Sequence, residues 1–418
     1  MPASLAVVDA ILQDDYKDYR ENLNNKTLLL SEVKQRSDTV SGRRATHSVH
    51  LGRSGAIGAA PESTVLPVAD QQRYAAVQVP MRTNRSRIQL TVQLIEQADG
   101  DPGSFIDALE GEMNIMNDSM RDVNRQLYGT SNGVIATCGT TAASATVQLL
   151  TTTPLSVMRH LYVGRQIDIG TVAASFTIAQ TRSITAVSIT NRTITISGAV
   201  VTTVSGTHFI FNTFSGGAST NTGLPGDGQA ELTGLQTICS TTAVLHTIDP
   251  AVQPAWQAQV YSNSGTLRPL AETTLDLALL GATAESGVTP AMMISNTGVF
   301  VAGKAILTGY QRNIDVLELP GGFKGIKWST PGVSGIAGKD VGWFADFDCP
   351  PNALFGINTE SLVLHQTGEG WQWMQEDGAI LSRVSGSLAY EAVAFAIQEL
   401  ACKQRNANFL ISDLIEAS

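Results

Sequence analysis

Alternating apolar and polar residues mark the first strongly patterned part of the chain, residues 42–94. The outgoing stretch ATHSVHLG and the returning stretches AAVQVPM and RIQLTVQL repeat with the period of two that is typical of half-buried strands. Turn-forming residues separate them: Gly52, Gly55, Gly58, Pro61 and Pro67. The pattern predicts a strand–loop–strand arm with no continuous apolar run that could close a core of its own.

The length of this arm sets how far it can reach. About 25 residues on each side extend up to roughly 80 Å, whereas a compact chain of 418 residues has a radius of gyration of ~22 Å. We therefore expect the arm to project beyond its own body and to be buried on something else.

Residues 101–129 carry the clearest helical period. Asp101 can cap the helix, Pro102 lies near its first position, and Gly129 follows as a stop signal. Apolar side chains recur every three or four residues, and core packing explains this stripe better than ligand binding does. The expected core positions of the helix are Phe105, Leu109, Met113, Met116, Met120, Val123 and Leu127.

Residues 131–235 change character, because charges become sparse while Thr, Ser, Gly and β-branched residues dominate. ITAVSITNRTITISG predicts a hairpin that turns at residues 190–192, and LYVGRQIDIG and THFIFNTF predict further strands. We interpret this region as a small β-barrel or sandwich inserted into the chain.

The rest of the chain, from residue 236 onward, mixes helical and strand patterns. GTLRPLAETTLDLALLGATAES is helical after Pro269, and AMMISN and VLELPGG are typical of strands. GWFADFDCPPNALFGIN and SLVLHQTGEGWQWMQEDGAIL each predict strand, turn and strand. GSLAYEAVAFAIQELACKQRNANFLI predicts a closing amphipathic helix, with Leu388, Val393, Ile397 and Leu400 on one face, and then a short strand. The whole pattern indicates an α+β fold.

Composition narrows the function. Charged residues make up 15% of the chain, against a usual ~25%, which favours a surface covered by something other than water. The net charge of −10 argues against tight, sequence-specific nucleic-acid binding but not against enclosing nucleic acid. The first residues lack a basic segment and no run of about 18 apolar residues occurs, so we expect neither a signal peptide nor a membrane span. We expect reduced, buried thiols of a cytosolically folded protein at Cys138, Cys239, Cys349 and Cys402.

Candidate catalytic motifs are weak. GVFVAGKA matches a phosphate-binding loop up to Lys304, but Ala305 stands where Ser or Thr would hold magnesium, so a strand-to-helix corner is favoured over a nucleotide site. His47 and His50 would lie on opposite faces of a strand, which suits surface contacts better than a metal.

Two further pairs of residues fit structural roles. Asp346 and Asp348 would share one face of a strand, where hydrogen bonding or an ion pair is favoured over acid–base chemistry. Trp371 and Trp373 fit an aromatic interface or core better than a sugar platform. We predict no catalytic, cofactor-binding or metal-binding residue, no cofactor, and no enzymatic activity.

Arginine is the only basic side chain of the arm besides its histidines. Guanidinium groups pair well with carboxylates on a partner surface, although a solvated face is the alternative. The expected intersubunit contacts are Arg43, Arg44, Arg53, Arg73, Arg82, Arg85 and Arg87.

The order of these elements resembles the major capsid proteins of tailed bacteriophages, which have the Hong Kong 97-type fold. GRRATHSVHLGRSGAIGA with STVLP looks like that family's extended loop, and FIDALEGEMNIMNDSMRDVNRQLYG looks like its spine helix. The segments from DCPPNALFGIN to GAILSR, and LACKQRNANFLI, look like its closing segments. The likeness covers almost the whole chain, although no single motif is specific.

The resemblance implies a division of the chain into seven parts. These are an N-terminal arm at 1–41, an extended loop at 42–98, the spine helix with peripheral domain at 99–135, an inserted β-barrel-like domain at 136–235, a peripheral return at 236–275, an axial domain at 276–380, and the end of the peripheral domain at 381–418.

The resemblance also implies a function: self-assembly into pentamers and hexamers of an icosahedral shell that encloses double-stranded DNA without reading its sequence. Scaffolding, portal and cement proteins would be further partners, and the virion capsid, assembled in the host cytoplasm, would be the location. Some relatives cross-link subunits through a lysine in the extended loop, but no lysine lies between Lys34 and Lys304 here, so we expect a non-covalent shell.

Three alternatives remain at this stage. A tail tube or fibre protein would suit the β-rich composition, but the helix at 101–129 argues against it. A hydrolase around Asp346 and Asp348 lacks a visible nucleophile, and a phosphate-loop enzyme lacks the residues noted above.

Overall fold

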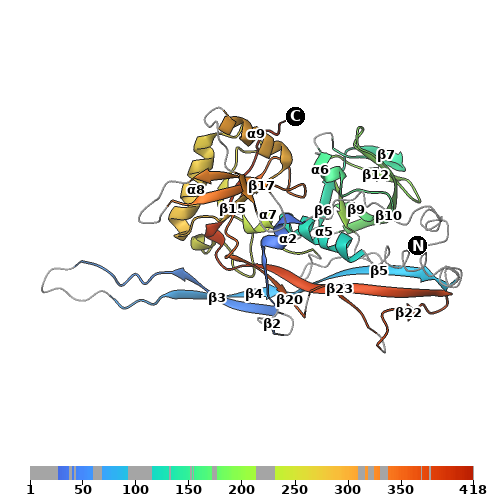
Figure 1. The fold of residues 1–418 in the computed structure, drawn as a ribbon, viewed down its shortest axis with the longest axis horizontal. Helices are drawn as coiled ribbons and strands as arrows, with labels where there is room; N and C mark the ends of the chain where they lie inside the picture. The colour runs from blue at the N-terminus through green and yellow to red at the C-terminus, as the bar shows by residue number, and fades with distance from the viewer. Residues whose placement is uncertain are drawn as a thin grey trace.

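The computed structural model shows an elongated chain with a long hairpin projecting from its body (Figure 1). In the described part of the chain, that body holds three large sheets and a two-stranded one formed by β7 and β12. The structure describes residues 27–36, 40–41, 44–59, 68–92, 115–130, 133–150, 153, 155–171, 177–212, 231–308, 316–318, 324–329, 338–368, 370–375 and 378–417.

The projecting hairpin consists of β3 (Arg44–Gly52) and β4 (Arg73–Pro80), which pair in antiparallel register from Arg44 opposite Pro80 to Gly52 opposite Arg73. A short strand, β2 (Val40–Ser41), adds to β3. Ala45, Val77 and Val79 are buried at the base, whereas Ile57 near the tip is 84% exposed. The predicted arm is therefore present, but its base is buried on the chain's own body, which corrects the expectation that only other molecules would cover it.

The third predicted arm segment belongs to the body. β5 (Arg82–Thr91) turns away from β4 and pairs antiparallel with β23 (Ala389–Cys402) over ten residues. The other edge of β23 is occupied in succession by three shorter strands, and β1 then adds in parallel to the last of them. These strands are β22 (Ser382–Arg383), β21 (Gln372–Trp373), β20 (Leu362–Gln366) and β1 (Lys34–Arg36).

The prediction of a closing helix was wrong, because β23 is a strand of 14 residues. Ala, Glu, Gln and Leu favour helix by intrinsic propensity, and the larger apolar side chains happened to recur at helical spacing. The burial instead alternates, with Ala392, Ala394 and Ala396 facing inward and the residues between them half-buried. Pairing along both edges outweighs local propensity at this central position.

The β-rich region forms a sheet with its own apolar core, whose buried members all lie between Ile135 and Ile210. The strand order is β6-β13-β9-β10-β11-β8, and a bridge between Cys138 and Leu149 joins the ends of the two edge strands, as in a small barrel. The predicted hairpin is β10–β11, with Ser188 opposite Thr193. The elements are β6 (Val134–Thr137), β7 (Thr141–Ser144), β8 (Thr146–Gln148), α6 (Leu155–Met158), β9 (Gln166–Thr171), β10 (Thr177–Ser188), β11 (Thr193–Ile196), β12 (Val201–Thr203) and β13 (His208–Asn212).

A seven-stranded mixed sheet forms the other lobe, covered by α8 (Glu272–Ser286) and α9 (Thr297–Thr308) (Figure 1). The stretch GVFVAGKA, residues 298–305, lies inside α9, and the strand-to-helix corner expected there lies just before it, between Ser295 of β15 and Thr297. A Cβ on Gly303 would lie 1.8 Å from the Trp343 ring, so this glycine serves close helix–sheet packing. In order across the sheet the strands are β14 (Gln259–Tyr261), β24 (Phe409–Ile411), β19 (Leu354–Ile357), β15 (Met292–Ser295), β18 (Asp340–Ala345), β17 (Lys324–Ser329) and β16 (Val316–Glu318).

Helix α5 (Ile115–Tyr128) joins these parts. It is the described portion of the predicted helix; residues 101–114, with Phe105, Leu109 and Met113, lie outside the described residues, as does the side chain of Met116. Val123 and Leu127 are buried as predicted, but Met120 is 37% exposed and is not a core residue, because it lies on the face turned away from the main core. Short helical segments complete the body: α2 (Leu28–Glu32), α7 (Leu235–Ile238), η1 (Pro254–Trp256) and η2 (Arg405–Ala407).

Candidate functional site

The structure offers two candidate sites: the arginines of the arm and a network of polar side chains around α5. The arm arginines fall into two groups. Arg44, Arg53 and Arg73 are exposed on the hairpin, where the Nη1 of Arg44 donates to the Oε1 of Gln78 at 2.7 Å.

The arginines of β5 have more contacts within the chain. The Nε of Arg82 donates to the Oε2 of Glu399 at 3.0 Å in a buried ion pair, so a contact inside the chain accounts for this charge. Arg87 pairs with Glu391, and Arg85 is exposed. Arg43 lies outside the described residues.

Asp70 joins the two sides of the arm beyond the ends of β3 and β4. Its carboxylate accepts hydrogen bonds from the backbone N–H groups of Gly55 and Gln71, each at 2.8 Å, and these bonds lower the pKa of the carboxyl group. Val68 beside it is 90% exposed. The described residues on either side of the tip thus present exposed apolar side chains, Ile57 and Val68.

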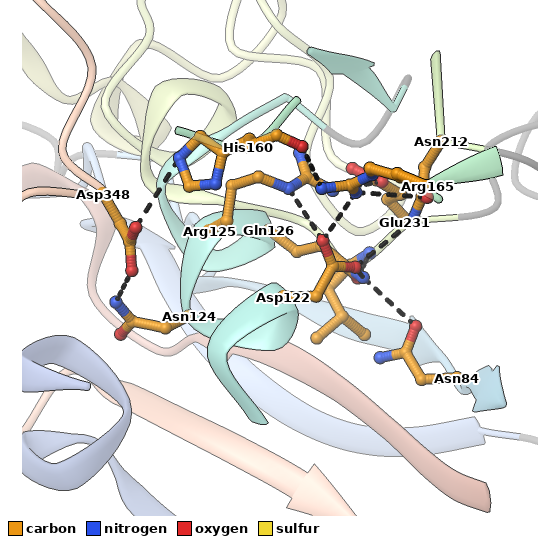
Figure 2. A network of polar contacts seen from close by, with 11 residues as sticks. Asn84, Asp122, Asn124, Arg125, Gln126, His160, Arg165, Asn212, Glu231 and Asp348 are labelled. Atoms are coloured by element: carbon orange, nitrogen blue, oxygen red, sulfur yellow. Dashed lines mark hydrogen bonds and ion pairs between the residues drawn. The ribbon is translucent and has the colours of Figure 1, made fainter. Parts of the chain in front are cut away.

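Asp122 lies at the centre of the polar network that Figure 2 shows. Its Oδ1 accepts from the Nε of Arg125 at 3.0 Å and from the Nη2 of Arg165 at 2.9 Å. Its Oδ2 accepts from Gln126 at 2.9 Å and from Asn212 at 3.2 Å. Because Arg165 and Asn212 come from the β-rich region, this one carboxylate ties that region to α5.

The charges around Asp122 compensate one another. Burial alone would raise the pKa of Asp122, but the guanidinium groups of Arg125 and Arg165 hold it well below its usual range. Arg125 also pairs with Glu231, whose pKa is raised because burial outweighs that pairing. Arg165 donates further to the carbonyl of His160 at 2.6 Å. The network is a closed set of charge-assisted bonds.

A second set of bonds joins α5 to the turn after β18. Asn124 donates to Asp348 at 2.7 Å and accepts from the backbone N–H of Leu30 at 3.1 Å, while the Tyr128 hydroxyl donates to Asp346 at 2.7 Å. Asp346 and Asp348 therefore take the hydrogen-bonding role that was favoured for them. They lie in a turn and not on a strand face, because β18 ends at Ala345.

His160 approaches this turn from the β-rich region, with its Nε2 3.6 Å from the Oδ1 of Asp348 (Figure 2). Burial and the charge of Asp346 raise the pKa of Asp348 to about 6. Burial and the charges of Arg125 and Arg165 lower the pKa of His160 to about 3. A cavity of about 160 Å³ lies beside this contact.

The network consists of hydrogen bonds and ion pairs that join separate parts of the chain. Burial and the charge of Asp346 raise the pKa of the Cys349 thiol far above its usual value, so this thiol beside the carboxylates stays protonated. Within the described residues, no group of three His, Cys, Asp or Glu side chains is arranged to hold a metal ion. No described helix is long and apolar enough to cross a membrane.

The remaining candidates have ordinary surroundings. Trp371 packs against the main core, and His50 bonds Gln72 on the hairpin surface. The four cysteines are buried and free, as predicted. Sequence reasoning missed Asp122, Arg165 and Glu231. Asp122 has partners three and four residues away on its own helix, but Arg165 and Asn212 lie 43 and 90 residues from it, and Glu231 lies 106 residues from Arg125. No local spacing indicates these long-range contacts.

No protein-family model matches the sequence, and no curated protein matches it either. Solved structures do resemble it. A chain of the cyanophage A-1(L) capsid asymmetric unit aligns with a TM-score of 0.58 at 12% identity, over 96% of this chain and 97% of that one. The capsid of a native GTA particle gives 0.47 at 9% identity, covering 96% and 95%, and Mycobacterium phage Bobi gives 0.43 at 8%, covering 98% of each chain.

The first of these likenesses shows a shared fold over nearly the whole length of both chains. The resemblance to phage capsid proteins is thus confirmed at the level of the fold, and the chain is a mixed α/β protein with a capsid-like architecture.

Proposed function

We propose that the chain is the major subunit of a phage-type capsid, which assembles into pentamers and hexamers of an icosahedral shell around double-stranded DNA. The observation that carries this proposal is the fold-wide likeness to the cyanophage A-1(L) capsid chain. Scaffolding, portal and cement proteins are the further partners we propose, with the virion as the final location and the host cytoplasm as the place of assembly.

The projecting arm supports assembly. Its base is fixed by buried Ala45, Val77 and Val79, while its tip carries exposed Ile57 and Val68. Because exposed apolar side chains at the end of a rigid strand pair gain free energy when a partner covers them, the tip suits a contact with a second copy. The exposed arginines of the hairpin would pair there with carboxylates of an acidic neighbour.

The polar network supports the same function from inside the subunit. A shell subunit must keep its parts in fixed relative positions, since small errors in orientation accumulate over many copies. Asp122 and Asp348 each join α5 to a different part of the body. We assign these residues the role of holding the subunit rigid, and we propose the domain bounds given above for its parts.

The alternatives fit less well. A tail tube or fibre protein would not be expected to share its fold with a capsid chain over nearly the whole length of both chains. A hydrolase would need carboxylates that reach a substrate, but Asp346 is buried and accepts from Tyr128, and Asp348 accepts from Asn124.

Shortening the arm tests the proposal. Because Gly52 lies opposite Arg73, replacing residues 53–72 by Asn-Gly closes the hairpin with a two-residue turn and leaves its base intact. We expect the full chain to sediment as shells or capsomers and the shortened chain to sediment as much smaller species, with thermal unfolding unchanged. An unaltered sedimentation profile would rule out the arm as an assembly contact. Particles of the full chain, boiled in SDS, should run as a single monomer band.

A further inference from the structure

Three histidines meet where the arm leaves the body. His47 lies on β3, His246 lies in the tight turn between Leu245 and Ile248, and His365 lies on β20. We call them the arm-base histidines. Both other rings lie close enough to lower the pKa of His246. The side chains of Leu245 and Ile248, which flank the turn, share one apolar core with Ala45, Val77 and Val79 of the arm.

The surroundings of these rings favour the neutral form. His246 is buried, and its Nε2 has no hydrogen-bond partner among the described residues. Both ring nitrogens of His47 are likewise enclosed and shielded from solvent. A backbone group of Cys402 faces the His47 ring, and one of Leu400 faces the His246 ring. Each of these contacts favours the protonated form of its histidine.

Fixed positive charges lie close by. Arg405 is fully buried and donates to the backbone carbonyls of Thr237, Ile238, Ala243 and Trp256. Its charge disfavours protonation of His246, as that of Lys403 does for His47. The carboxylate on the adjoining strand, Glu399, stands in register with His365 and is bound by Arg82 and by the N–H of Thr233.

The turn that carries His246 is strained. His246 has φ +49° and Thr247 has φ +74°, in a two-residue turn closed by two hydrogen bonds between Leu245 and Ile248. Such turns strongly prefer glycine or asparagine at both central positions. Packing retains this conformation and places the His246 ring beneath the arm.

We propose that the arm-base histidines form an acid-responsive release for the arm: when neutral they pack β3 and β4 onto the body, and when protonated they detach the hairpin base from it. Two observations carry this inference, the enclosure of the His47 and His246 rings and the strained turn at the point where arm and body meet. It does not depend on shell formation.

The direction of the effect follows from the pKa values. Burial and neighbouring cations lower the pKa of His246 from 6.5 to about 3, and burial and Lys403 lower that of His47. A depressed pKa means that the packing contributes stability above pH 6.5 and loses it as the pH falls toward 3. Between pH 7.5 and 5.0, His246 alone should increase the released fraction roughly 30-fold.

Hydrogen exchange followed by mass spectrometry tests this inference on the full chain at pH 7.5 and 5.0, with rates corrected for intrinsic exchange. We expect peptides from residues 44–52 and 73–80 to exchange tens of times faster at pH 5.0. His246→Asn should abolish most of this increase, because Asn tolerates positive φ and does not ionise. His50→Gln, three residues from His47 on the exposed face, is the matched control and should behave as the wild type.

Two results would overturn the inference: equal corrected exchange at both pH values, or a full increase retained in His246→Asn. If that variant does not fold, His47→Gln makes the same test. The carboxyl of Glu399, whose pKa burial raises to about 7, titrates in the same range. Since Glu399 is present in every variant, its contribution cannot account for a loss of the increase in His246→Asn.

Discussion

Asp122 shows how much of the fold depends on single polar residues. Its carboxylate accepts bonds from Arg125 and Gln126 on its own helix and from Arg165 and Asn212 on the β-rich region. A helix pattern identifies such a residue only as polar. The partners that make it structural are supplied by strands β9 and β13 and the turns beside them, which no local spacing in the sequence could reveal.

Asp122→Asn should destabilise the protein, because it leaves two guanidinium groups without their shared counter-charge. Breaking a buried pair costs about 3–5 kcal/mol, and since the Asp122 side chain is 27% exposed, we expect a loss of about 3 kcal/mol in the free energy of unfolding. Denaturant titration measures it. Asp340→Asn, at an exposed position of β18, is the control and should change stability by less than about 0.5 kcal/mol. Equal losses in both variants would refute this role for Asp122.

At the scale of elements, the strands with strict alternation were predicted correctly, and β23 was not. ATHSVHLG alternates polar and apolar residues, and ITAVSITNRTITISG is rich in β-branched residues around a turn. Both features are typical of strands, and the two stretches form β3 and the β10–β11 hairpin. In β23 the side chains that face inward are alanines. Because alanine is small and only weakly hydrophobic, these positions do not stand out from their neighbours in the sequence. The small size of the alanines has a structural reason: this face of the sheet lies under α5, where Ser86 bonds Ser119.

Two adjacent substitutions test this account of β23. Ala394→Leu adds volume between the strand and α5, where Ala394 is fully buried, and should cost about 1–3 kcal/mol. Val393→Leu, on the half-buried opposite face, should cost less than about 1 kcal/mol. The comparison is made by thermal unfolding. A larger loss for Val393→Leu would fit the helical pattern and contradict the strand.

At the scale of the whole molecule, the order of arm, helix, β-rich region and mixed sheet was predictable, since each has its own period or composition. The attachment of these parts to one another was not. The β5–β23 pairing joins residues about 300 positions apart. This separation is longer than a typical domain, so no local sequence pattern could indicate the pairing. The same long-range pairing is what leaves the β3–β4 hairpin to project alone (Figure 1).

Electron microscopy of the full chain, expressed alone and purified by sedimentation, tests the central proposal most directly. The account predicts closed spherical shells, or rings of five and six subunits, with the hairpin of one subunit lying over its neighbour. Tubes or rods, or a uniform monomer at all concentrations, would contradict it.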